Sequence, residues 1–194
     1  MNRKDFAQCW DMGLHEFPYR RAIYQMVVEK FSVRKALYPG CGLDISPSFF
    51  IPHVIYIDSA PLVAAFFQER ERLQLEISKE KQYDEPCCAE FHHMDYRMPA
   101  QFPAVDLLLS QHAGAVSQVM KQFLKPGGLL LVAEGPDDVV ELARNDPDFQ
   151  FLGTVRWSPE QVEIIPEWLP PMFYRSAGLG IPIPIERQYC FKKL

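Results

Sequence analysis

The sequence predicts an α/β protein with a doubly wound, mostly parallel sheet of seven strands in a single domain. Strand-like apolar runs alternate with helical patterns along the chain, which is typical of this class. Several runs are apolar almost throughout, as are strands that are covered on both faces. The length of 194 residues suits one domain with a substantial core.

The first half of the chain supplies two strands and two helices. Residues 17–31 carry apolar side chains at helical spacing, which predicts a helix. Residues 35–40, KALYPG, form an apolar run ending in Pro-Gly and fit a buried strand that enters a turn. Residues 53–58, HVIYID, are β-branched and aromatic, which favours a second strand. A long charged helix is expected over residues 61–82, with Pro61 at its first position.

The alternation continues in the second half. Five further strands are expected, at residues 87–96, 104–111, 128–135, 149–157 and 187–193. A helix over residues 113–124, ended by KPGG, separates two of them, and another is expected over residues 136–147. The proline-rich stretch 163–186 is predicted to be a loop.

Composition limits the classes of partner and compartment. Apolar residues make up 48% and charged residues 23%, which is ordinary for a globular protein. The formal net charge of -5 argues against nucleic acid as a partner, because phosphate backbones bind positive surfaces. No apolar run reaches the length of a membrane span and no signal-peptide core follows the first residues, so we expect no membrane partner and a cytoplasmic location. The five cysteines lack paired metal-ligand spacing and predict reduced thiols, mostly buried.

A glycine turn follows the first predicted strand. In ALYPGCGLDIS, residues 36–46, Gly40 and Gly42 stand two apart, and Asp44 lies where a nucleotide-binding loop would often carry a third glycine. Glycines let the main chain approach a ligand closely, and doubly wound sheets bind ligands at the carboxyl ends of their strands. The turn is therefore either a cofactor site or only a turn.

Four sequence segments, taken in their order along the chain, resemble those of class I S-adenosylmethionine-dependent methyltransferases over roughly residues 35–155. They are ALYPGCGLD, VIYIDSAP, EFHHMDYRMP and VDLLLSQHAG…LKPGGLLLVAEG. The last is the most specific, because an Asp-led apolar strand, a helix, LKPGG and another apolar strand are typical of the family. The resemblance implies S-adenosylmethionine as cofactor and a Rossmann-type fold with an antiparallel last strand. It divides the single domain into a helical segment (1–34), a cofactor-binding core (35–155) and a proline-rich loop with the final strand (156–194).

The resemblance also implies which residues bind the cofactor. They are Tyr38, Gly40, Gly42, Asp44, Asp58, Ser59, Asp95, Tyr96, Ser110 and Gln111. Asp58, eighteen residues after Gly40, is expected to accept hydrogen bonds from both ribose hydroxyls. Asp95 would bond the adenine amino group. Ser110, Gln111 and His112 would face the transferable methyl group.

The turn departs from the family pattern in two places and is followed by an unusually short connection. Tyr38 stands where the family commonly has an acid, and Asp44 stands where it has a third glycine. Asp44 either supplies the carboxylate that meets the ammonium of the cofactor or caps a helix. A helix that starts at Ser46 is limited by Pro52 to little more than one turn, so the methionine end is expected to be less enclosed than usual.

The leading functional hypothesis is an S-adenosylmethionine-dependent methyltransferase of a small molecule. Methyl transfer from a sulfonium relies mainly on positioning, with His112 as candidate general base or, alternatively, as a structural residue. A second hypothesis is a methyltransferase-like binding or interaction protein without catalysis. A third is a nicotinamide-dependent oxidoreductase, whose G-x-G-x-x-G pattern would need glycine at Ile45.

The acceptor pocket is expected from aromatic residues outside the core motifs, although core packing explains the same residues. They are Phe6, Trp10, Phe17, Tyr19, Trp168, Phe173 and Tyr174. No metal site is predicted, because the adjacent His92 and His93 would point to opposite faces of a strand. Nothing in the sequence sets the oligomeric state.

Overall fold

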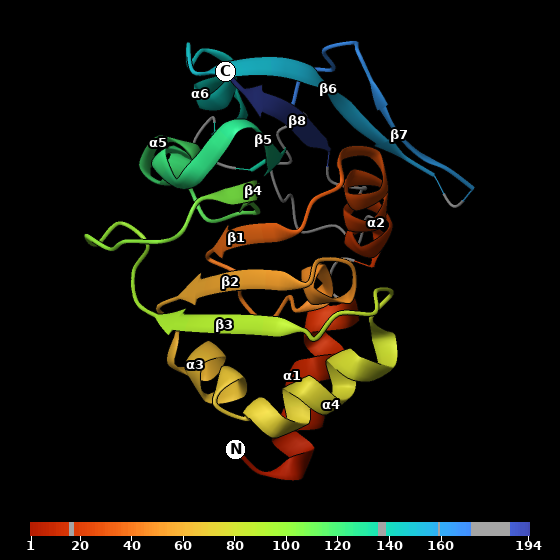
Figure 1. Ribbon diagram of the computed structural model, residues 1–194, viewed down its shortest axis with the longest axis vertical. Coiled ribbons are helices and arrows are strands. Elements are labelled where there is room, and N and C mark those ends of the chain that lie inside the picture. Colours follow the sequence, from red (N-terminus) through yellow and green to blue (C-terminus); the bar gives the residue numbers. More distant parts are fainter. Residues whose placement is uncertain (16–17, 136–138, 159, 172–186) are drawn as a thin grey trace, which may run out of the picture.

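A computed structural model describes residues 1–15, 18–135, 139–158, 160–171 and 187–194. Within these residues, one sheet holds eight strands in the order β3-β2-β1-β4-β5-β8-β6-β7 (Figure 1). The strands are β1 (Lys35–Pro39), β2 (His53–Asp58), β3 (Cys88–His93), β4 (Val105–Ser110), β5 (Leu124–Ala133), β6 (Phe149–Trp157), β7 (Val162–Ile165) and β8 (Gln188–Lys193). Strands β1 to β5 run parallel, whereas β8 is antiparallel to both of its neighbours, β5 and β6. The predicted fold class is confirmed.

Helices cover both faces of the sheet. One layer comprises α1 (Arg3–His15), α2 (Tyr19–Phe31), the 3₁₀ helix η1 (Ser46–Phe49), α3 (Pro61–Phe67) and α4 (Arg70–Glu80). The other comprises α5 (Val116–Met120), the 3₁₀ turn η2 (Lys121–Phe123) and α6 (Val139–Arg144). Successive residues of β1 serve the two layers in turn, since Ala36 and Tyr38 pack with the first and Leu37 with the second.

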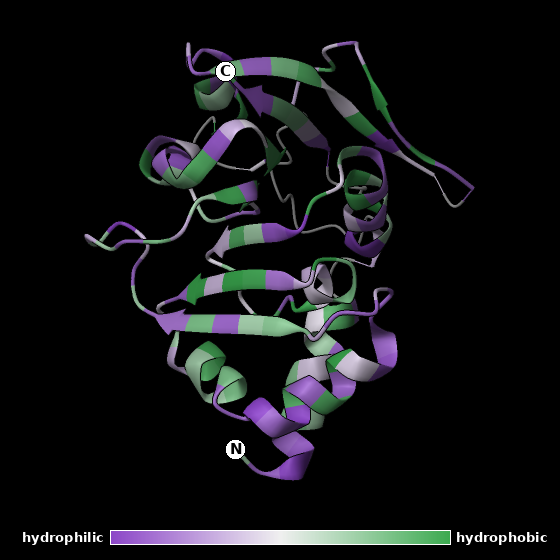
Figure 2. Ribbon diagram, in the orientation of Figure 1, coloured by the Kyte–Doolittle hydropathy of each residue, from purple (hydrophilic) through white to green (hydrophobic). Residues whose placement is uncertain are grey.

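Burial follows the pattern that predicted the strands. Residues 54–57 of β2 are all buried, and the strand is coloured largely hydrophobic in Figure 2. In contrast, α4 is mostly hydrophilic and buries only Leu73 and Ile77 (Figure 2). None of the helices in the described part of the chain has the combined length and apolar character that crossing a bilayer would require.

The long helix expected over residues 61–82 is two helices. Helix α3 ends at Phe67 and α4 begins at Arg70. The chain turns at Glu69, whose carboxylate lies 2.7 Å from the amino-terminal ammonium group of Met1. This contact joins residues far apart in the sequence, so helical periodicity could not indicate the break.

The sheet has one strand more than the seven predicted. Strand β7 lies partly in the expected proline-rich loop and pairs antiparallel with residues 154–157 of β6. Its four residues are too few to give a reliable alternating pattern. Residues 166–171 of that predicted loop are described and form no helix or strand, and residues 172–186 lie outside the described residues.

Strand β5 begins earlier than expected, at Leu124 instead of Gly128. The LKPGG segment therefore lies within the strand and follows directly on η2, which ends at Phe123. Leu124 pairs with Val105, and the next pair joins Leu129 to Leu107, so the register shifts across the proline and glycines. Proline and glycine inside a strand are typical of such irregularities.

Candidate cofactor site

The turn after β1 is held in a conformation that suits glycine. Gly40 has a φ of +62°, and a Cβ atom there would lie 2.3 Å from the Cβ of Ala113. Gly42 has a φ of +55°, but a Cβ atom there would meet nothing within 4 Å. Gly40 is therefore required by both conformation and space, and Gly42 by conformation alone.

Asp58, the last residue of β2, anchors this turn. Its Oδ2 accepts a hydrogen bond from the backbone N–H of Gly42 at 2.9 Å, and its Oδ1 accepts one from Ala60 at 2.8 Å. A carboxylate oxygen can accept more than one hydrogen bond. The partly exposed Asp58 can therefore still accept bonds from a ligand.

A cavity of about 300 Å³ opens beside Asp58, at the carboxyl ends of the strands. It is lined by Gly40, Asp58, Ser59, Met94, Asp95, Tyr96, Arg97, His112 and Ala113. This volume is at the lower end of small-molecule sites, which span about 300–1,000 Å³. The cavity brings together residues that follow β1, β2, β3 and β4, at the edge where the topology of the sheet favours ligand binding.

Asp95 lies in the cavity but is held by Arg97. Oδ1 of Asp95 accepts from the backbone N–H of Arg97 at 2.9 Å and from its Nε at 3.0 Å, and Oδ2 accepts from Nη2 at 2.6 Å. The bonded guanidinium lowers the pKa of Asp95 to about 2, so the carboxylate stays ionised. Sequence reasoning missed Arg97, together with Met94 and Ala113. Arg97 and Met94 belong to the quoted segment EFHHMDYRMP, and a basic residue two positions after an acid was the available signal.

His112 lies at the edge of the cavity in an unusual backbone conformation. Its φ is +61°, a left-handed value that few residues other than glycine adopt. The next residue, Ala113, packs over Gly40, and its carbonyl accepts a hydrogen bond from the Tyr96 hydroxyl at 2.5 Å. Backbone strain of this kind tends to occur at functional sites.

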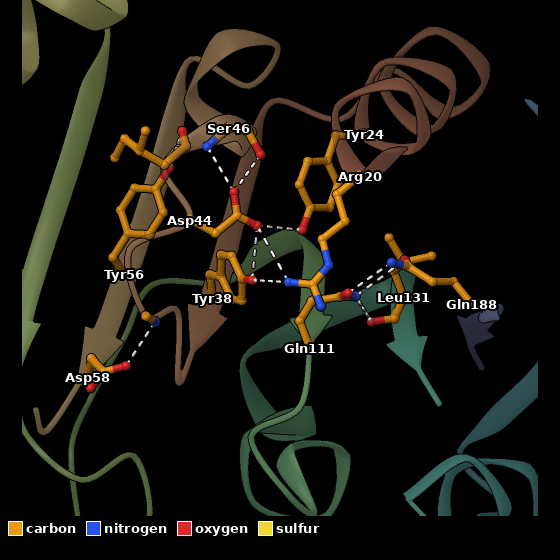
Figure 3. Close-up of polar contacts among 12 residues, drawn as sticks. Arg20, Tyr24, Tyr38, Asp44, Ser46, Tyr56, Asp58, Gln111, Leu131 and Gln188 are labelled. Carbon is orange, nitrogen blue, oxygen red and sulfur yellow. Dashed lines mark hydrogen bonds and ion pairs between the residues drawn. The ribbon is translucent and has the colours of Figure 1, made fainter. Parts of the chain in front are cut away.

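A buried polar group, which we call the turn cluster, lies on the other side of the glycine turn. It consists of Arg20, Tyr24, Tyr38, Asp44 and Ser46 (Figure 3). Oδ2 of Asp44 accepts from the hydroxyls of Tyr24 and Tyr38, each at 3.1 Å, and Oδ1 accepts from the backbone N–H of Ser46 at 3.1 Å. Nη1 of Arg20 lies 3.8 Å from the Asp44 carboxylate.

The turn cluster bears on both roles considered for Asp44. Its bond to the N–H of Ser46 spans two residues and is a local turn bond directly before η1, whose N-cap is Ile45 and carries no side-chain capping bond. Burial, followed by the charge of Asp44, raises the pKa values of the Tyr24 and Tyr38 hydroxyls well above their ordinary value, so both remain neutral donors. Asp44 is 8% exposed and Tyr38 is 1% exposed, and neither lines the cavity. The carboxylate proposed to meet an ammonium group is thus directed to protein donors.

Ser110 and Gln111, expected to face a methyl group, are also buried. Gln111 accepts a hydrogen bond from Nε2 of Gln188 at 2.9 Å (Figure 3). Neither Ser110 nor Gln111 lines the cavity. All but one of the predicted residues therefore fall into two groups. One group lines the cavity and comprises Gly40, Asp58, Ser59, Asp95, Tyr96 and His112. The other is buried and does not line the cavity, and it comprises Tyr38, Asp44, Ser110 and Gln111. Gly42 is partly exposed and belongs to neither group.

The aromatic residues expected around an acceptor serve packing where they are described. Ring centroids lie 5.4 Å apart for Phe6 and Phe66, and 6.0 Å apart for Trp10 and Phe49. Tyr19 contacts Trp157, and Trp168 contacts Tyr189, in the same way. Phe17, Phe173 and Tyr174 lie outside the described residues.

The histidines next to the cavity do not form a metal centre. His92 lies 2.7 Å from the carboxylate of Glu90, whereas the ring of His93 lies 3.1 Å from the carbonyl of Ser59. Across the described ranges, no three His, Cys, Asp or Glu side chains are placed to hold one ion.

Comparisons with known proteins bear on the fold. No protein-family model and no curated protein matches the chain. The solved structure of the N-methyltransferase NodS from Bradyrhizobium japonicum WM9, in complex with S-adenosyl-L-homocysteine, is similar with a TM-score of 0.57 at 13% identity, over 93% of this chain and 90% of that chain. An O-methyltransferase from Bacillus cereus in complex with the same compound has a TM-score of 0.57 at 9% identity, over 100% of this chain and 92% of that chain.

An enzyme named as an rRNA methylase has the same TM-score. The 16S rRNA methylase RmtB has a TM-score of 0.57 at 13% identity, over 100% of this chain and 76% of that chain. At such identities the likeness concerns the fold. The chain has the fold of class I S-adenosylmethionine-dependent methyltransferases, as the order of its sequence motifs implied.

Proposed function

We propose that this chain is an S-adenosylmethionine-dependent methyltransferase that acts on a small molecule. The observation that carries the proposal is the position of Asp58. It ends β2, fixes the glycine turn through Gly42, and lines a cavity with Asp95 from the end of β3. A nucleoside laid across these strand ends would meet carboxylates at its sugar and near its base.

The chain's own residues fit the nucleoside end of this cofactor. Asp58 would accept hydrogen bonds from the ribose hydroxyls, with Ser59 beside it. Gly40 leaves the main chain bare where the 5′ end of the sugar would lie. S-adenosylmethionine, when bound, would supply a methyl group bonded to a sulfonium sulfur, and the thioether that remains is a good leaving group. His112 at the edge of the cavity would take a proton from a hydroxyl or amine acceptor.

Charge favours a small acceptor over RNA, although an rRNA methylase shares the fold. A protein that binds a phosphate backbone presents a positive surface, and this chain has a formal net charge of -5. We therefore assign the acceptor to the small-molecule class.

One observation favours a second candidate, a nucleoside-binding protein without methyl transfer. Tyr38, Asp44 and Gln111 are buried and bonded to protein groups, so the residues expected to meet the methionine end of the cofactor are already engaged within the protein. A nucleoside without an amino-acid tail would need no rearrangement there. The whole cofactor would need the turn cluster to exchange partners, with Arg20 and Asp44 as the charges nearest the tail.

Calorimetry with S-adenosylhomocysteine and with adenosine tests both candidates. The methyltransferase proposal predicts that the wild-type chain binds S-adenosylhomocysteine, and that Asp58→Ala weakens binding at least about tenfold, because charge-assisted hydrogen bonds to the sugar are lost. Asp11 is an exposed carboxylate on α1, so Asp11→Ala is the matched control and should bind both compounds as wild type does.

The outcomes separate the candidates. If adenosine binds and S-adenosylhomocysteine does not, the second candidate is supported. Binding of neither compound overturns both. If S-adenosylhomocysteine binds, a screen for transfer of a radiolabelled methyl group to small hydroxyl and amine compounds then decides whether catalysis is retained.

A further inference from the structure

We propose that Tyr96 is a positioning residue that holds the strained backbone at His112 and thereby sets where the 5′ substituent of a bound nucleoside lies. The role toward the ligand rests on the proposed nucleoside binding. The role toward the backbone stands on the geometry of the chain alone.

The segment between β4 and α5 is fixed on two sides. On one side, the Cβ of Ala113 packs directly over Gly40, where no side chain could be added. On the other, the hydroxyl of Tyr96 donates to the Ala113 carbonyl at 2.5 Å. A Cβ atom added to Gly114 would lie 3.4 Å from that same hydroxyl. Tyr96 thus ties the exit of β3 to the exit of β4 across the cavity.

The backbone between these contacts is unusual. His112 has a φ of +61° and Gly114 one of +78°. Glycine adopts such values readily, but histidine does so only when its surroundings enforce them. The Tyr96 hydroxyl binds the carbonyl of the residue that follows His112, which places it to enforce this conformation.

The order of the strands relates this segment to the ligand. The sheet runs β3-β2-β1-β4, and the cavity is lined by residues that follow each of these strands. With the base near Asp95 after β3 and the sugar at Asp58 after β2, the 5′ substituent points toward Gly40 after β1 and His112 after β4. Movement of His112 and Ala113 therefore changes the space for the 5′ substituent more than that for the base.

The test compares two ligands that differ at this position. Adenosine carries a 5′ hydroxyl, and S-adenosylhomocysteine carries a 5′ thioether with an amino-acid tail. Tyr96→Phe keeps the ring and removes only the hydroxyl. We expect it to weaken S-adenosylhomocysteine about three- to fivefold, because binding must restore the conformation that the bond held and one net hydrogen bond sets the upper limit, and adenosine by less than about twofold.

A double-mutant cycle identifies the residue through which Tyr96 acts. Glycine at residue 112 accepts the left-handed conformation without enforcement, so Tyr96→Phe in a His112→Gly background should change S-adenosylhomocysteine affinity by less than about twofold. Tyr83→Phe removes a comparable bond, from a hydroxyl to the Ser48 carbonyl at 2.8 Å, in a residue that does not line the cavity. This control should leave both affinities unchanged.

Other results overturn the proposal. Equal weakening of both ligands by Tyr96→Phe would mean that the hydroxyl contacts the nucleoside directly. If Tyr96→Phe weakens binding equally with histidine and with glycine at residue 112, Tyr96 does not act through His112. If the wild-type chain binds neither ligand, the proposed function fails, and backbone NMR shifts of residue 112 still decide the structural part. They should lose the signature of a positive φ in Tyr96→Phe, and an unchanged signature would overturn the inference.

Discussion

Gly42 donates its backbone N–H to the Asp58 carboxylate at 2.9 Å, which joins the turn after β1 to the end of β2. The other oxygen of Asp58 accepts from Ala60, immediately before α3. One carboxylate therefore fixes a turn, a strand end and the start of a helix before any ligand arrives. Asp58 itself is therefore held in place and would need little reorganisation to bond the sugar of the proposed nucleoside.

The two glycines of the turn should respond differently to alanine. Gly40→Ala adds a Cβ that would lie 2.3 Å from the Cβ of Ala113, at a positive φ, and should cost about 2–4 kcal/mol of unfolding free energy. Gly42→Ala has a similar φ but meets nothing within 4 Å, and should cost about 1–2 kcal/mol. Urea denaturation of both variants measures the difference.

A compensating change isolates the steric part of this difference. Ala113→Gly in the Gly40→Ala background removes the atom that the new Cβ meets, so the double variant should resemble Gly42→Ala in stability. Equal costs for the two single variants would contradict the close packing of Ala113 on the turn.

Arg20 should matter far more to stability than Arg21. Arg20 is 3% exposed and pairs with Asp44 in the turn cluster, so Arg20→Met leaves a buried carboxylate without its cation and should cost about 3 kcal/mol. Arg21 pairs with Glu80 at the surface, and Arg21→Met should cost less than about 1 kcal/mol. Thermal or urea unfolding gives both values.

The partner of Arg20 provides the control. Asp44→Asn removes the charge that Arg20→Met leaves uncompensated, so the double variant should lose less stability than the sum of the two single variants. Strict additivity would mean that the pair does not interact.

Several strands could be predicted because short runs of apolar, β-branched and aromatic residues mark them in the sequence. The strands expected at 53–58 and 149–157 have the same bounds in the structure. The ends of the predicted strands also pointed to Gly40, Asp58 and Asp95, and all three residues line the cavity. A short sequence stretch was sufficient for each of these elements.

Features that depend on contacts between distant residues were missed. The break before α4 involves Met1 and Glu69, and the turn cluster joins Arg20 of α2 to Asp44 of the glycine turn. The burial of Asp44 accompanies the second contact. Nothing near Asp44 in the sequence indicates that α2 supplies its partners.

Asp106 should make folding stability depend on pH. It accepts bonds from the backbone N–H groups of Arg34 and Lys35 and from the Lys125 ammonium at 2.7 Å. Burial by itself would raise its pKa, but these donors lower it overall. A carboxyl group with a lowered folded-state pKa stabilises the fold above its unfolded pKa, about 4, and this contribution is lost as the pH falls through the lower folded value.

The measurement is the unfolding midpoint as a function of pH. Between about pH 5 and pH 2 the midpoint should fall for the wild-type chain, and Asp106→Asn should reduce the slope in this range because it removes one linked proton. Asp84→Asn, a carboxyl group on an exposed residue, should leave the slope unchanged. Identical slopes for wild type and Asp106→Asn would contradict the role of these donors.

Thiol labelling should distinguish Cys88 from the cysteine of the glycine turn. Cys88 is exposed, whereas Cys41 is 3% exposed and burial, followed by the charge of Asp58, raises its pKa well above the ordinary value. Burial also raises the pKa of Cys190 to about 12.

Because the thiolate is the reactive form, a disulfide reagent at pH 8 should label Cys88 first and the half-buried Cys87 more slowly. The remaining three should react only after unfolding, and Cys88→Ser should abolish the fast phase. Labelling of Cys41 in the native protein at a rate near that of Cys88 would contradict this prediction and would show that the glycine turn opens in the folded state.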